Sequence, residues 1–112
     1  MVALDGYRGG VVSGLEMIDD KLADNNETTH RGKLLPLGKT VTIVCSVRKE
    51  GARVVAAGNK IIEWNGDSKR LSLRDLWKVK RNDTLFLGAF STRFLIRKME
   101  IVEISGNGKS IR

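Results

Sequence analysis

The chain has 112 residues, of which 41% are hydrophobic, and carries a formal net charge of +7. This length allows one domain at most, and this hydrophobic content excludes an intrinsically disordered chain. No apolar run approaches the roughly 18 residues of a membrane-spanning helix, so the sequence encodes no membrane span.

The N-terminal third combines one predicted strand with a long polar loop. Residues 1–10 are short and glycine-rich, and Val11 to Ile18 alternate loosely between apolar and polar side chains, which predicts a strand. Residues 19–32 are rich in Asn and Asp and lack apolar periodicity, so they form a loop. A connection of this length often carries function.

Residues 40–64 predict a meander of three short strands. In residues 40–48, Val41, Ile43, Cys45 and Val47 share one face, a period of two with many β-branched side chains. Residues 49–52 form a hairpin turn, with Gly51 placed where a positive φ is needed. The partner strand covers residues 53–57, and a third strand covers residues 61–64 after a second turn.

The remainder predicts one short helix and two closing strands. Leu73, Leu76 and Trp77 are spaced i, i+3 and i+4 after Ser72 as N-cap, which indicates one or two helical turns near residues 72–78 with Trp77 in the core. Residues 84–90 are typical of a buried strand, and residues 94–104 of a last strand with a bulge. Residues 106–112 are expected to be a flexible tail that follows a single domain over residues 1–105.

The positive charge lies mostly in the second half of the chain. Residues 1–56 carry 8 Lys and Arg against 7 Asp and Glu, and residues 57–112 carry 12 against 6. No run of five basic residues occurs and the aromatic residues are not interleaved with Lys and Arg, so a solvated surface is favoured over nucleic-acid binding. Cys45 is the one cysteine, which excludes an internal disulfide and predicts a small buried side chain within a strand.

The order of these pieces resembles the concanavalin-like lectin and glucanase jelly rolls, including laminin-G-like domains. The resemblance is carried by TVTIVCSVRKEGARVVAAGNKIIEWNGD, by the short helix after it, and by LFLGAFSTRFLIRKMEI. More narrowly, the chain is similar to lectin-like domains of bacterial multidomain proteins. The resemblance implies an all-β antiparallel β-sandwich of the jelly-roll kind with one short helix near residues 72–78.

Two departures from this family matter. Its members have further strands upstream of the position of Met1, which implies a domain incomplete at its N-terminus and an open sheet edge that pairs with a second copy or another domain. Glucanases of this fold place alternating carboxylates on one strand face, whereas Glu16 and Asp19 are three residues apart and point to opposite sides. We therefore expect no catalytic activity.

Trp64 is the most informative candidate for ligand binding. Ile61 and Ile62 beside it favour a core side chain. The alternative is an exposed ring that stacks on a sugar, with Asn65 and Asp67 supplying hydrogen bonds to hydroxyl groups.

A second candidate site is the polar run of residues 24–28. Its Asn25, Asn26 and Glu27 are candidate ligand contacts, and their oxygens suit Ca²⁺, although the spacing does not match a helix–loop–helix calcium site and a solvated loop is the ordinary explanation. Arg93 lies near the last predicted strand and would bind an acidic saccharide if it faces a concave surface.

The expected function is a non-catalytic carbohydrate-binding module that needs no cofactor. A structural or protein–protein interaction module using an unpaired strand is the alternative, and nucleic-acid binding is a distant third.

Overall fold

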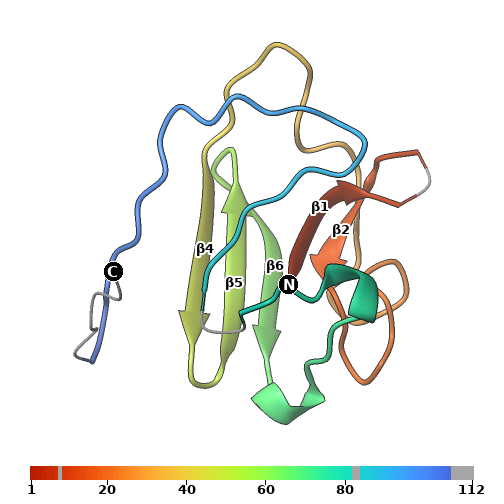
Figure 1. The fold of residues 1–112 in the computed structure, drawn as a ribbon, viewed down its shortest axis with the longest axis vertical. Helices are drawn as coiled ribbons and strands as arrows, with labels where there is room; N and C mark the ends of the chain where they lie inside the picture. The colour runs from red at the N-terminus through yellow and green to blue at the C-terminus, as the bar shows by residue number, and fades with distance from the viewer. Residues whose placement is uncertain (8, 82–83, 107–112) are drawn as a thin grey trace. The chain divides into compact units, whose positions relative to one another are not determined.

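The computed structural model describes residues 1–7, 9–81 and 84–106. The chain divides into two compact units, Met1–Asn82 and Asp83–Arg112. Strands and short 3₁₀ helices lie in the first unit, and Figure 1 labels strands β1, β2, β4, β5 and β6 on the ribbon.

The first sheet has three antiparallel strands in the order β1-β2-β3, namely β1 (Val2–Gly6), β2 (Val12–Leu15) and β3 (His30–Arg31). Strand β2 was expected within residues 11–18, whereas β1 and β3 were not expected. Strand β1 pairs with β2 from Val2 opposite Leu15, with an irregularity between Ala3 and Gly6. Strand β3 ends the long loop and pairs with β2 over two residues, with His30 opposite Ser13.

The second sheet confirms the predicted meander. Strands β4 (Ile43–Arg48), β5 (Gly51–Ala56) and β6 (Asn59–Asn65) pair antiparallel in that order and run side by side in Figure 1. Ala57 and Gly58 both have positive φ and form the two-residue turn between β5 and β6, whose twist suits a tight hairpin. A register shift in β6 leaves Ile61 as the extra residue of a bulge.

Both sheets of the first unit contribute to one hydrophobic core. Opposed residues of an antiparallel pair lie on the same face, so Val54, Ile62 and Trp64 all point to the core side of the second sheet. Leu15 and Ile18 come from β2 and the residues after it. The buried core consists of Leu15, Ile18, Val54, Ala56, Ile61, Ile62 and Trp64.

The turn between β4 and β5 differs from the expectation for Gly51. Its φ is not positive, and Gly51 is the first residue of β5. A Cβ at this position would lie 1.9 Å from the carbonyl oxygen of Trp64. Glycine is therefore needed here for close backbone approach rather than for a left-handed turn.

The predicted helix near residues 72–78 is replaced by two single-turn 3₁₀ helices, η1 (Ser68–Arg70) and η2 (Asp75–Trp77). Ser72 is not an N-cap, because its backbone pairs with Met17 and its Oγ donates to Asp20 Oδ1 at 2.7 Å. The backbone of this segment is thus bonded to the chain after β2, which prevents a continuous helix from starting at Ser72.

The strands predicted over residues 84–90 and 94–104 are wrong. Within the described residues of the second unit, 84–106, the backbone forms no strand, and apolar side chains such as Leu85 and Phe90 are exposed. Alternation specifies a face, but a strand also needs a hydrogen-bonding neighbour. The expected tail lies outside the described residues from position 107 onward.

Cys45 is exposed on β4 rather than buried, which corrects a further expectation. Strand β4 is an edge strand of the second sheet, so β5 is its one neighbouring strand in that sheet. Along its core-facing side, Ile43 and Val47 are also exposed.

The described residues thus form an all-β protein with two three-stranded antiparallel sheets. Among them, no helix has the length and apolar character required to cross a membrane.

Candidate functional site

The loop between β2 and β3 is organised around the side chain of Asn26. Its Nδ2 donates to the carbonyl oxygens of Leu15 at 2.8 Å, Leu22 at 3.0 Å and Lys21 at 3.1 Å. Its Oδ1 accepts from the backbone N–H of Thr28 at 2.9 Å and from Thr28 Oγ1 at 2.6 Å. Asn26, expected to contact a ligand, uses both ends of its amide to hold the loop in shape.

Thr28 ties this loop to the first sheet. Its side chain is buried, and its Oγ1 accepts from the backbone N–H of Leu15 at 2.9 Å. The loop therefore has a fixed conformation that depends on two side chains, and its remaining polar groups are presented from a rigid backbone.

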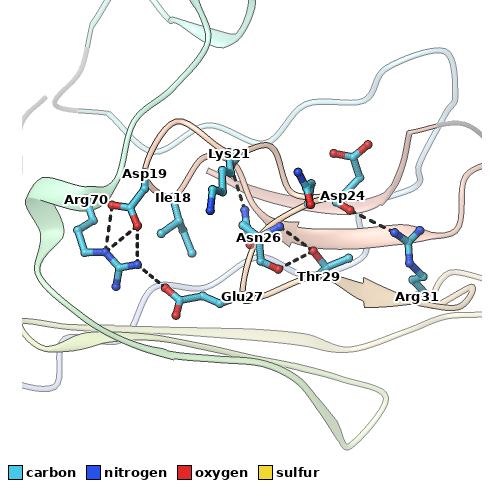
Figure 2. Close-up of a pocket in the computed structure, with 10 residues that line it drawn as sticks. Ile18, Asp19, Lys21, Asp24, Asn26, Glu27, Thr29, Arg31 and Arg70 are labelled. Carbon is cyan, nitrogen blue, oxygen red and sulfur yellow. Dashed lines mark hydrogen bonds and ion pairs between the residues drawn. The ribbon is translucent and has the colours of Figure 1, made fainter.

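The loop borders an open pocket of about 500 Å³ (Figure 2). Three cationic and three anionic side chains line it, together with amide and hydroxyl groups. The lining residues are Ile18, Asp19, Lys21, Asp24, Asn25, Asn26, Glu27, Thr29, Arg31 and Arg70. Nine of these ten residues come from the predicted loop or its ends.

One wall of the pocket is a chain of ionic contacts centred on Arg70. Its Nη2 lies 2.6 Å from Asp19 Oδ2 and 2.9 Å from Glu27 Oε1, and its Nε donates to Asp19 as well (Figure 2). Through these hydrogen bonds the guanidinium lowers the pKa of Asp19, because the charged form is favoured. Asp19 in turn raises the pKa of Arg70.

Trp64 extends this chain into the core. Its Nε1 donates to Glu27 Oε1 at 2.9 Å, and the side chain is 4% exposed. A ring this buried has no exposed face on which a sugar could stack. Trp64 is a core residue that positions Glu27.

The other predicted contacts lie outside this pocket. Asn65 is exposed at the end of β6 and lines a second, smaller hollow. Asp67 caps η1, because its Oδ1 accepts from the backbone N–H of Lys69 at 2.9 Å. Arg93 is exposed in the second unit, on a segment that is not a strand.

Three side chains of the pocket are available to a ligand. Within the described residues, the side chains of Lys21, Asp24 and Asn25 make no hydrogen bond or ion pair. Arg31 Nη2 donates to the backbone carbonyl of Asp24 at 3.2 Å and has no carboxylate partner there. Sequence reasoning missed Arg70, which is 43 residues from Glu27 and carries no local signal of this contact.

Glu16 belongs to a separate, buried network. Its carboxylate is 1% exposed and accepts from the Tyr7 hydroxyl, while Arg74 Nε lies 2.8 Å from its Oε1 as an ion pair. Burial, followed by the hydrogen bond to Glu16, raises the pKa of Tyr7 to about 12. Glu16 and Asp19 thus have different arginine partners.

Among the described residues, no three His, Cys, Asp or Glu side chains are grouped so that they could hold a metal ion. Comparisons of the chain with protein-family models, with curated proteins and with solved structures found no match.

Proposed function

We propose that this chain is a non-catalytic carbohydrate-binding module whose binding site is the pocket formed by the β2–β3 loop. The observation that carries this proposal is that the loop expected to contact a ligand borders a pocket of about 500 Å³. We further propose that its two sheets belong to a β-sandwich of the jelly-roll, concanavalin-like kind.

The chemistry of the lining suits a sugar. A saccharide presents many hydroxyl groups, each of which donates and accepts hydrogen bonds. Asn25 supplies an amide, Asp24 an acceptor and Lys21 a donor, and these three side chains make no hydrogen bond or ion pair in the described residues. A volume of about 500 Å³ is within the range of small-molecule sites.

The Arg70 wall supports recognition by shape. Asp19, Glu27 and Arg70 are already bound to one another, so their oxygens and nitrogens are fixed before a ligand arrives. A fixed wall lowers the entropy cost of binding. Because the stacking ring is absent from the pocket, we expect weak affinity that depends mainly on hydrogen bonds.

A matched pair of asparagines tests this function. Asn25 lines the pocket, whereas Asn65 lies at the end of β6 and lines a different hollow. A glycan array should identify ligands of the wild-type chain, and calorimetric titration should then show that Asn25→Ala weakens binding by up to about tenfold, the loss of roughly one hydrogen bond. Asn65→Ala should bind as wild type does.

The outcome that overturns the proposal is equally concrete. If no glycan binds the folded wild-type chain, or if Asn25→Ala and Asp24→Ala both bind as wild type does, the pocket is not a saccharide site. Repeating the titration with Ca²⁺ and with a chelator tests the expectation that binding needs no cofactor.

The exposed side of β4 favours a second candidate function, protein–protein interaction by strand addition. Val47 is 76% exposed, and it shares the core-facing side of this edge strand with Ile43 and Cys45. Apolar edge strands are ready templates for pairing. Sedimentation analysis should then detect self-association or partner binding that Val47→Lys abolishes, and a monomer with no β4-dependent partner would contradict this function.

A further inference from the structure

The outer face of the second sheet, opposite the core, carries its own arrangement of polar side chains. Ser46 lies opposite Arg53, and Arg53 lies opposite Glu63, so these three form one row across β4, β5 and β6. The next row consists of Arg48, Gly51 and Asn65. Opposed residues share a face, so both rows point the same way.

Gly51 is the centre of the second row and has no side chain. A Cβ there would collide with the carbonyl oxygen of Trp64, so no larger residue fits the observed backbone. Between the two rows the sheet has a hollow of about 250 Å³, lined by Arg48, Arg53 and Asn65 among others.

Two arginines flank the hollow on one diagonal. Arg53 lies opposite Ser46, and Arg48 is two residues further along β4. Arg48 and Arg53 are therefore diagonal neighbours, a relationship that places their Cα atoms about 7–8 Å apart. At that spacing both guanidinium groups reach a single small group held between them. Ser46 and Asn65 add neutral hydrogen-bond donors at the rim.

The charged side chains in and beside the hollow have a positive net charge. Glu63 is paired with Lys60, which lowers the pKa of the Glu63 carboxyl chiefly through their hydrogen bond. Glu50 is the second carboxylate of the lining. The charge of Arg53 also lowers the pKa of Glu63. The lining has two arginines and two carboxylates, and Lys60 beside Glu63 brings the local balance to one positive charge.

We propose that this hollow, centred on Gly51 and flanked by Arg48 and Arg53, binds an oxyanion such as a carboxylate or sulfate group. Guanidinium groups bind such anions through paired hydrogen bonds, which adds direction to charge. The residues that line the hollow are different from those that line the loop pocket.

Titration of the wild-type chain with sulfate and with acetate, at constant ionic strength maintained by chloride, tests the proposal. Amide resonances of Gly51, Arg53 and Asn65 should shift along saturable curves. Arg48→Gln and Arg53→Gln should each weaken binding about tenfold, as expected for one charge-assisted hydrogen bond. Both side chains are exposed, so an unchanged amide spectrum elsewhere verifies the fold of each variant.

Arg31→Gln is the matched control, because it removes an exposed arginine that lines the loop pocket instead. It should leave sulfate and acetate binding unchanged. Shifts that rise linearly without saturation, or equal losses in Arg31→Gln and Arg48→Gln, would overturn the proposal. Glucuronate distinguishes the source of the anion: tighter binding than acetate indicates a carboxylate carried by a saccharide, and equal binding indicates a free anion.

Discussion

The indole Nε1 of Trp64 and the carboxylate of Glu27, 37 residues apart in the chain, are joined by a hydrogen bond of 2.9 Å. The same Glu27 oxygen accepts from Arg70. One exposed carboxylate therefore connects a core side chain with the wall of the pocket, and its substitution should affect both stability and binding.

Two substitutions at Glu27 separate these roles. Glu27→Gln keeps an oxygen that accepts from Trp64 but removes the charge opposite Arg70, whereas Glu27→Ala removes both. We expect Glu27→Ala to lower the free energy of unfolding by about 1–2 kcal/mol, since the indole N–H loses its partner, and Glu27→Gln to cost less. Urea denaturation followed by circular dichroism measures both. Equal stability of wild type and Glu27→Ala would mean that the hydrogen bond contributes nothing.

Trp64 should be far more important for stability than Trp77. Trp64 is buried in the core cluster, whereas Trp77 is half-buried next to Arg74. Trp64→Ala should therefore destabilise the fold by about 3–5 kcal/mol through the cavity that it leaves. Trp77→Ala is the matched control and should cost less. A folded Trp64→Ala variant with wild-type stability would contradict the packing of the second sheet described above.

The pair of Asp19 and Arg70 should give the fold a dependence on acid pH. The pKa of Asp19 is lowered by its hydrogen bonds to Arg70, so this pair stabilises the folded state above the unfolded pKa of about 3.9. That stabilisation is lost as the pH falls through the lower, folded pKa. Asp19→Asn should thus be less stable than wild type near pH 7, and the difference should vanish in strong acid.

Asp24→Asn is the control for this titration. Among the described residues Asp24 has no ion-pair partner. The difference in stability between Asp24→Asn and wild type should therefore not change with pH over the same acid range. Denaturation curves at pH 7, 4 and 2.5 provide the comparison. A difference between wild type and Asp19→Asn that is constant across this range would show that the pair does not act through its charge.

Gly51→Ala should be strongly destabilising. The added Cβ would lie 1.9 Å from the Trp64 carbonyl oxygen, and backbone cannot move aside as a flexible side chain can. We expect a loss of more than about 2 kcal/mol. Gly6→Ala is a suitable control, because its Cβ would be 3.8 Å from the nearest atom. Similar melting temperatures for the two variants would contradict the close approach of β5 and β6.

Local sequence patterns were sufficient for the second sheet and for β2, and insufficient for β1, β3 and residues 84–104. Residues 40–64 alternate regularly and are separated by short turns, so each strand meets its neighbour in sequence. Strand β3 has two residues, too few for any pattern to be recognised. Residues 84–90 were predicted as a buried apolar strand and residues 94–104 as a strand with a bulge, yet neither segment forms a strand, because a side-chain pattern does not specify a pairing partner.

The candidate site shows the same division between local and distant information. The composition of the β2–β3 loop indicated Asn25, Asn26 and Glu27, and all three line the pocket. Their different roles could not be read from composition, because Asn26 is distinguished by the carbonyl groups that surround it in space. Arg70 reaches the pocket from beyond β6, and the contact depends on the whole arrangement of the first unit.

The shared oxygen of Glu27 also gives the molecule an optical readout of its own. The Trp64 indole donates to the Glu27 oxygen that also accepts from Arg70, so its emission should respond to a change in the field of that carboxylate. A ligand that binds beside Arg70 should thus alter the intrinsic tryptophan fluorescence of the protein, so no attached dye is needed. Replacing Trp77 by phenylalanine would remove the one other indole and leave Trp64 as a single internal probe.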